Sequence, residues 1–155
     1  MSVLSRVAIE TEDMERCTAI LEVVCGATGN QAVVEFDRAA IELQQGSEQG
    51  VRQIVFTDVD LAMASRRLSG NKIPAAESDD SIVIAAHHAS GIEVRLESVE
   101  APISAAGTAV LDHVALRVGN LARASSLWQS ILGVMPVQMG VHPVSGGTFE
   151  AARFP

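Results

Sequence analysis

The chain has 155 residues, 48% of them hydrophobic, which is enough for one sizeable core or two small ones. The net charge is −8 with acidic and basic residues interspersed, and this argues against binding to nucleic acid or to an anionic membrane, because neutralising phosphates requires basic patches. No run approaches the roughly 18 apolar residues of a membrane span. The first residues also lack the apolar segment of a signal peptide.

The two cysteines, Cys17 and Cys25, fall within one expected helix. Eight helical residues separate them by about 12 Å along the axis, which is too far for a disulfide. We therefore expect free, buried thiols in a reducing compartment, and hence a cytoplasmic protein.

An internal repeat organises the chain. Residues 3–26 and 110–133 align without a gap at an offset of 107. A weaker third copy at residues 50–68 places Gln53 opposite Arg6 and His113. The six identical pairs of the two stronger copies are Val3 and Val110, Leu4 and Leu111, Val7 and Val114, Ala8 and Ala115, Arg16 and Arg123, and Gly26 and Gly133.

Each copy predicts a strand followed by a helix. The apolar runs that predict the strands are Val7–Ile9, Ile54–Phe56 and Val114–Val118. A residue that can cap a helix N-terminus follows each run, and then an apolar stripe of period 3.6; these caps are Asp13, Asp60 and Asn120. Gly26 and Gly133 stand where a helix end favours a left-handed residue.

Further strands are expected after each helix, at 31–36 and 39–44, at 81–89 and 91–99, and at 135–142 and 148–154. The chain then divides into paired modules at 1–100, a linker at 101–108, and a third, incomplete βαββ module at 109–155, which lacks a counterpart of strand 39–44. An unpaired sheet edge favours association. We therefore expect a homodimer that completes the third module; the alternative is that the chain is a fragment of a longer protein.

Three short motifs carry a resemblance to a known family: LDHVALRV at 111–118, GVRQIVFTDVDL at 50–61 and GIEVRLESVE at 91–100. With the repeat, they resemble the vicinal oxygen chelate superfamily of glyoxalases, bleomycin-resistance proteins and extradiol dioxygenases. The resemblance implies an α+β glyoxalase-like fold, in which repeated βαβββ modules pair into a curved mixed sheet around a cleft. In metal-dependent relatives, four side chains of the opening and closing strands hold a divalent cation that polarises substrate oxygens.

The resemblance places four residues of this chain at those positions: Arg6, Glu42, Gln53, and either Arg95 or Glu97. Strand alternation puts Glu93, Arg95 and Glu97 on one face, so all three could face the cleft. A guanidinium has no lone pair and cannot bind a cation. Arg6 beside Glu42 therefore favours an ion pair in place of the metal, or an anchor for a ligand carboxylate. The alternative is that Arg6 is a surface residue at a sheet edge.

Three histidine-containing segments are further candidates. In the third copy His113 has the ligand-type side chain, and it is a candidate metal ligand, although a structural histidine is the alternative. His87 and His88 are adjacent in the strand expected at 81–89, so they should face opposite sides and not chelate together. The glycine-rich segment after His142 is expected to be a flexible hairpin or a lid.

These observations favour a glyoxalase-like protein that binds a small, carboxylate-bearing ligand in a cleft with a degenerate metal site. Apolar residues of strands 31–36, 81–86 and 92–96 are expected to wall the cleft, with Arg6 at one end. No cofactor is firmly expected. A divalent metal belongs to the alternative, a metal-dependent lyase, isomerase or dioxygenase of the same superfamily.

Overall fold

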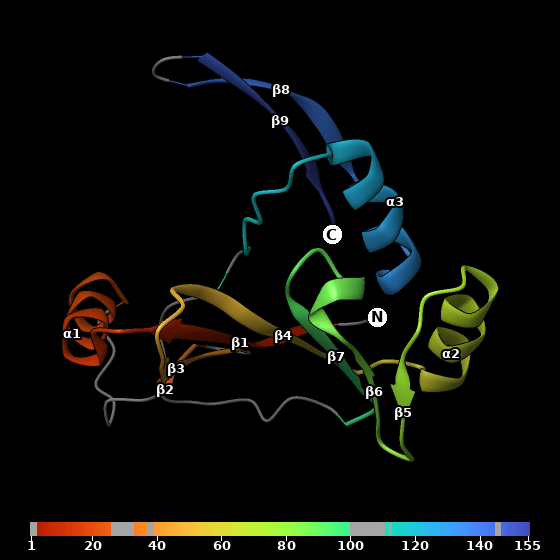
Figure 1. Ribbon diagram of the computed structural model, residues 1–155, viewed down its shortest axis with the longest axis horizontal. Helices are drawn as coiled ribbons and strands as arrows, with labels where there is room; N and C mark the ends of the chain where they lie inside the picture. The colour runs from red at the N-terminus through yellow and green to blue at the C-terminus, as the bar shows by residue number, and fades with distance from the viewer. Residues whose placement is uncertain (1–2, 26–32, 37–38, 100–110, 112, 145–146) are drawn as a thin grey trace.

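The computed structural model describes residues 3–25, 33–36, 39–99, 111, 113–144 and 147–155. A seven-stranded mixed sheet forms the body, and a separate two-stranded sheet forms an arm (Figure 1). In chain order, the elements of the body are β1 (Val3–Thr11), α1 (Met14–Cys25), β2 (Val33–Glu35), β3 (Ala40–Gln45), β4 (Gly50–Thr57), α2 (Leu61–Gly70), β5 (Ala76–Glu77), β6 (Ser81–Ile84), the short 3₁₀ helix η1 (Ala86–His88) and β7 (Glu93–Glu97). They are followed by α3 (Leu121–Leu132), β8 (Gln138–Val144) and β9 (Gly147–Arg153).

The strand order of the large sheet is β2-β3-β1-β4-β7-β6-β5. The opening strands of the first two modules, β1 and β4, lie antiparallel at its centre, with Val7 opposite Ile54. Each opening strand also pairs in parallel with the last strand of its own module, β1 with β3 and β4 with β7. Two similar modules therefore meet at the centre of one sheet, as the repeat predicts, and the α+β fold with a mixed sheet is confirmed.

The helices begin where the sequence predicts. The carboxylate or amide oxygens of Asp13, Asp60 and Asn120 each accept a hydrogen bond of 2.9 Å from the backbone N–H three residues later. Such bonds satisfy one of the free N–H groups at a helix start. Gly133 ends α3 with φ +75°, in the left-handed region, as its position in the repeat predicts, whereas Gly26 lies outside the described residues.

Apolar side chains of the sheet pack against the helices in two clusters. In the first module, buried Val34, Phe36, Ile41 and Leu43 pack with residues of α1 and with Leu111. In the second module, the cluster joins β4, β6 and β7 to α2, and Trp128 and Ile131 of α3 belong to the same cluster. The third module therefore shares a core with the second, while the proposed division of the chain at 101–108 remains a prediction because those residues are not described.

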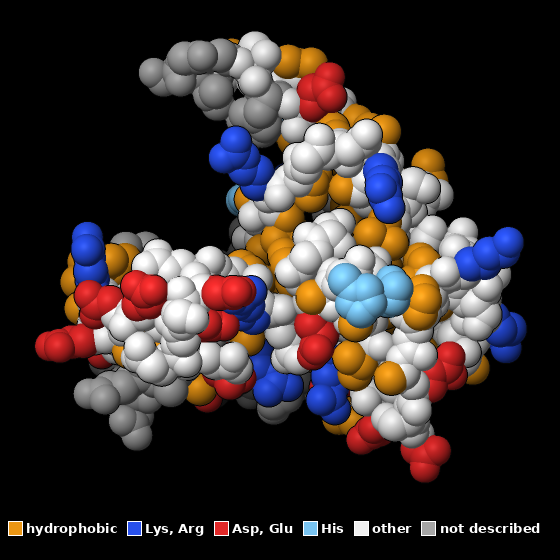
Figure 2. Space-filling view, in the orientation of Figure 1, with side chains coloured by type: hydrophobic (Ala, Val, Ile, Leu, Met, Phe, Trp, Pro, Cys, Tyr) orange, Lys and Arg blue, Asp and Glu red, His pale blue; other side chains and the backbone are white. Residues whose placement is uncertain are grey.

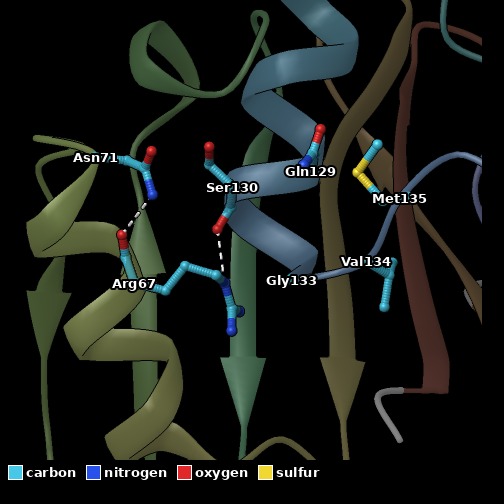
Figure 3. A pocket seen from close by; sticks show the side chains of 7 residues that line it. All are labelled: Arg67, Asn71, Gln129, Ser130, Gly133, Val134 and Met135. Atoms are coloured by element: carbon cyan, nitrogen blue, oxygen red, sulfur yellow. Dashed lines mark hydrogen bonds between the residues drawn. The ribbon is translucent and has the colours of Figure 1, made fainter.

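The side chain of Arg67 on α2 links this helix to α3 by hydrogen bonds (Figure 3). Its Nε and Nη2 atoms donate hydrogen bonds of 2.7 Å to the backbone oxygens of Ser130 and Ile131. These carbonyls belong to the last turn of α3, where backbone oxygens have no partner within the helix. The guanidinium of Arg67 on α2 therefore caps the C-terminal end of α3.

Two expected strands differ from the structure. Residues 113–118 form no strand, although burial alternates along them, with Val114, Leu116 and Val118 packing against the second-module cluster. The strand expected at 81–89 ends at Ile84, and His87 and His88 lie in η1 with ring centroids 3.8 Å apart. Their expected placement on opposite faces of a strand is therefore wrong. In the described part of the chain, no helix has the length and apolar character needed to cross a membrane.

Candidate functional site

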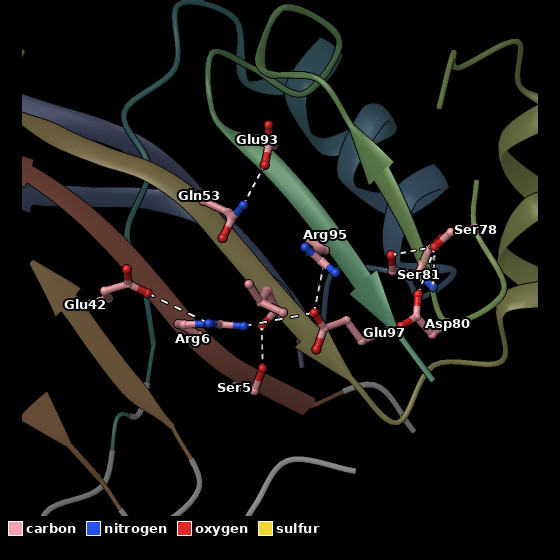
Figure 4. A network of polar contacts seen from close by, with 11 residues as sticks. Ser5, Arg6, Glu42, Gln53, Ser78, Asp80, Ser81, Glu93, Arg95 and Glu97 are labelled. Carbon is pink, nitrogen blue, oxygen red and sulfur yellow. Dashed lines mark hydrogen bonds and ion pairs between the residues drawn. The ribbon is translucent and has the colours of Figure 1, made fainter. Parts of the chain in front are cut away.

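Arg6 lies in the central strand β1 immediately after a β-bulge. Leu4 pairs with Phe56 and Arg6 with Val55, so Ser5 is an extra residue in β1. The hydroxyl of Ser5 donates a hydrogen bond of 3.1 Å to the backbone oxygen of Val55. Bulges bend a strand and redirect the next side chain. The side chain of Arg6, which follows this bulge, lies over the sheet between Glu42 and Glu97 (Figure 4).

The guanidinium of Arg6 lies between two carboxylates from different strands. Arg6 Nη1 is 3.8 Å from Glu42 Oε2 on β3, and Arg6 Nη2 is 4.0 Å from Glu97 Oε1 on β7. Both distances are longer than a hydrogen bond. The Arg6 side chain remains 42% exposed, so part of its donor capacity faces solvent. The expected ion pair of Arg6 with Glu42 is present, and Arg6 lies in the interior of the sheet and not at its edge.

A second guanidinium approaches the same carboxylate. Arg95 Nε lies 2.8 Å from Glu97 Oε1, but their geometry does not meet that of a hydrogen bond, and the Nε atom is buried without such a partner. Arg95 pairs with Val55 in the register of β4 and β7, and Val55 pairs with Arg6 across β1. The two arginines therefore lie on one row of the sheet, on either side of fully buried Val55.

Gln53 and Glu93 form the neighbouring polar pair. They are register partners in β4 and β7, and Gln53 Nε2 donates a hydrogen bond of 2.5 Å to Glu93 Oε1. Glu42, across Ala8 from Gln53, lies on the same row. The structure thus gathers all the residues taken from the resemblance, and Arg95 and Glu97 both belong to the group. We call this group the polar face; it consists of Arg6, Glu42, Gln53, Glu93, Arg95 and Glu97.

The apolar wall expected around Arg6 is present only in part, because Val33 on β2 and Val83 on β6 are register partners of Glu42 and Arg95 and therefore lie on their face of the sheet. The buried apolar residues of the strands concerned pack toward the helices, among them Val34 on β2, Ile82 on β6 and Leu96 on β7. Because side chains alternate along a strand, the opposite face carries the polar residues of β7 together with the less buried Val33 and Val83. Figure 2 shows acidic and basic side chains side by side over β1, β3 and β4, next to a hollow between the body and the arm.

The remaining candidates lie away from the polar face. His113 is exposed in the segment that precedes α3, outside both sheets. His142 lies in β8, which pairs antiparallel with β9, while residues 145 and 146 of the glycine-rich segment lie outside the described residues. Sequence reasoning missed Ser5, and although it placed Glu93 on the face of Arg95 and Glu97, it did not predict the hydrogen bond of Glu93 with Gln53. A bulge and a cross-strand amide–carboxylate bond both depend on strand register, which no local motif reveals.

Comparison with solved structures identifies the fold. A catechol 2,3-dioxygenase matches with a TM-score of 0.60 and 12% identity, over 95% of this chain and 65% of that one. The chain has the fold of the vicinal oxygen chelate superfamily. Methylmalonyl-CoA epimerases from Streptomyces coelicolor (13% identity, 64% of this chain and 98% of that one, TM-score 0.45) and Mycobacterium tuberculosis (19%, 61% and 85%, TM-score 0.41) are also similar. No family model matches the chain, and neither does any curated protein.

The polar face does not fit the divalent metal that metal-dependent members of this superfamily hold. A guanidinium lies between Glu42 and Glu97, where a cation bridging these carboxylates would have to lie. Arginine offers donors only and stays charged at neutral pH, so it repels a metal and cannot bind one. Among the described residues, no three His, Cys, Asp or Glu side chains gather in a way that could hold an ion. The chemistry of the polar face is therefore that of hydrogen bonds and ion pairs made by its own side chains.

Proposed function

We propose that the protein binds a small ligand bearing a carboxylate on its polar face, with Arg6 as the anchor. The observation that carries this proposal is the incomplete engagement of Arg6. Its two carboxylate contacts are 3.8 and 4.0 Å long and its side chain is partly exposed. A guanidinium can bind a carboxylate through two parallel hydrogen bonds of about 2.8 Å, which is closer and better aligned than either existing contact.

Arg95 and the acidic residues supply the rest of the binding surface. Arg95 lies on the same row as Arg6 and shares Glu97 with it, so a second guanidinium is available to an anionic ligand. Glu42 and Glu93 would accept hydrogen bonds from hydroxyl or amine groups of the ligand. Gln53 can donate or accept. The arrangement therefore favours a ligand with one acidic group and one or more donors, such as a hydroxy acid.

The alternative proposal is a metal-dependent lyase, isomerase or dioxygenase, and its support is the fold alone. One fold hosts many chemistries, so function must be argued from the site. Because a guanidinium lies between the carboxylates of Glu42 and Glu97, the side chains around Arg6 favour the binding of a ligand without a metal ion.

A thermal-shift screen with sodium salts of small carboxylic acids, and with the neutral amides of the same acids, tests the proposal. A ligand at about 100 times its dissociation constant stabilises the folded state by about 2.7 kcal/mol. We expect carboxylates to raise the melting temperature of the wild type. They should also raise that of the control variant Arg52→Ala, because Arg52 is a strand arginine that pairs with Glu10 and Glu48 and does not belong to the polar face. Arg6→Ala should show no such rise. Equal shifts in wild type and Arg6→Ala, or no carboxylate-dependent shift in the wild type, would reject the proposal.

We also propose that the protein is a homodimer in which the third module of each chain completes that of the other. The arm supports this, because its two strands pair only with each other within the described residues. One apolar stripe runs along the arm and the residues that lead into it, and its members are between 58% and 65% exposed: Met135, Val137, Met139 and Val141. Light scattering at micromolar concentration should give the mass of two chains, and a monomer mass would refute the association.

A further inference from the structure

Two arginines form a row of positive charge across the polar face. Arg6 on β1 and Arg95 on β7 flank Val55 of β4 in the register of the three strands. Both guanidiniums lie near the carboxylate of Glu97, yet neither makes a hydrogen bond to any described residue. The side chains of Arg6 and Arg95 are 42% and 39% exposed, so their remaining N–H groups are available to a ligand that lies above Val55.

The neighbouring row of the polar face carries negative charge. It contains Gln53, two residues before Val55 on β4, and the carboxylates of Glu42 on β3 and Glu93 on β7. Glu93 accepts a hydrogen bond from the neutral amide of Gln53, and no basic side chain of the described residues pairs with it. The Oε1 atom of Gln53 remains as an acceptor, and Figure 4 shows this end of the amide directed away from Glu93, on the side of Arg6. This row therefore offers one charged and one neutral acceptor to a donor group of a ligand.

The formal charge of the polar face discriminates among ligands that bear a carboxylate. The face has two arginines and three glutamates, so its formal charge is −1, in a chain of net charge −8. A hydroxy acid or a simple carboxylic acid would add a further negative charge to this surface, and like charges repel. A ligand that also carries an ammonium group adds no net charge, and it brings the cation that Glu93 lacks among the described residues.

We infer that the ligand is a free α-amino acid, whose carboxylate binds Arg6 and Arg95 and whose ammonium group binds Glu93 and the Oε1 atom of Gln53. The inference rests on the proposed binding of a carboxylate and names the class of the ligand. The two charged groups of an α-amino acid lie about 3 Å apart, and a charge-assisted hydrogen bond adds about 2.8 Å at each end. Such a ligand spans the two rows, because they are two residues apart along a strand, or about 6.8 Å between Cα atoms.

Matched ligands test the inference on the intact protein. Alanine, leucine and phenylalanine are each compared, by isothermal titration calorimetry, with the analogue that has a hydroxyl group in place of the ammonium and with the analogue that has neither. We expect at least one amino acid to bind about tenfold more tightly than its hydroxy analogue, because hydrogen bonds between charged groups are about twice as strong as neutral ones.

The variant Glu93→Gln tests the position of the ammonium group. It removes the charge but keeps the size of the side chain and an acceptor oxygen for Gln53. The amino acid should then bind no more tightly than its hydroxy analogue, whereas the hydroxy analogue itself should not bind more weakly, because a negative charge has been removed. The matched control is Glu22→Gln, the same change at an exposed position of α1, which should bind both ligands as the wild type does. Circular dichroism of each variant shows whether it is folded.

The failure of this inference is distinguishable from the failure of the proposed function. If hydroxy acids or simple carboxylic acids bind and no amino acid binds more tightly than its analogues, the amino-acid assignment is overturned and the carboxylate anchor stands. The same holds if Glu93→Gln weakens the amino acid and the hydroxy acid equally. If none of these carboxylates binds to the wild type, both the assignment and the proposed function are overturned.

Discussion

Arg67→Ala tests whether α3 is held to the body by the guanidinium of α2. The substitution removes two hydrogen bonds of 2.7 Å to the backbone oxygens of Ser130 and Ile131. Partial burial lowers the pKa of Arg67, which nevertheless stays charged at neutral pH. Hydrogen bonds to a charged donor contribute about 1.5–3 kcal/mol each, but water can reach these carbonyls once the side chain is gone, so a total loss of about 2 kcal/mol is expected.

Urea titration followed by the fluorescence of Trp128 measures this loss. Trp128 is the only tryptophan, and it lies buried in the cluster that α3 shares with the second module. For a chain of this size, about 2 kcal/mol corresponds to a fall of about 4–8 °C in the melting temperature. The matched control is Arg66→Ala, which removes the same charge from an exposed position of the same helix. If Arg67→Ala lies within about 0.5 kcal/mol of wild type, or costs no more than Arg66→Ala, the capping argument is refuted.

Two further predictions concern a helix cap and an acidic group. Asn120→Ala should lower the free energy of unfolding by about 1 kcal/mol, because it removes the hydrogen bond to the N–H of Arg123; urea titration checks this, and an unchanged midpoint would contradict it. The hydrogen bond from the Glu48 N–H, together with Arg52, lowers the pKa of Glu10 despite some desolvation, so its stabilising effect should be complete above its ordinary pKa and lost as the pH falls through the lowered value. The loss of stability between pH 6 and pH 3 should therefore be smaller in Glu10→Gln than in the wild type; equal losses would contradict the assignment.

The repeat made most of the fold predictable. Local signals determine a helix start, and the caps at Asp13, Asp60 and Asn120 lie where the sequence places them. The strand expected at 114–118 shows the limit of such signals. Alternation of apolar residues determines which side chains are buried, but a strand also requires a neighbour, and the pairing of distant segments is not encoded locally. At 85–88, alanine and histidine replace the β-branched residues of β6, and the chain turns into η1.

The sequence predicts which residues belong to the polar face, but it does not predict which of them contact one another. Alternation placed Arg95 and Glu97 on one face, and the structure shows that Glu97 lies near the guanidinium groups of both Arg6 and Arg95. Which carboxylate meets which arginine depends on the register of four strands and on the bulge at Ser5, so the sequence left Arg95 and Glu97 as alternatives. The expected apolar wall is incomplete because the buried apolar residues of these strands pack toward the helices, which leaves Val33 and Val83 beside the polar residues on the other face.

The central claim is that the guanidinium of Arg6 takes the place of a metal on the polar face. Elemental analysis of protein purified without chelator tests it most directly, with the Glu42→Ala variant measured in parallel. Because Arg6 lies between Glu42 and Glu97, we predict a transition-metal content well below one equivalent per chain in both proteins. One bound transition-metal ion per wild-type chain that is lost in Glu42→Ala would contradict the account.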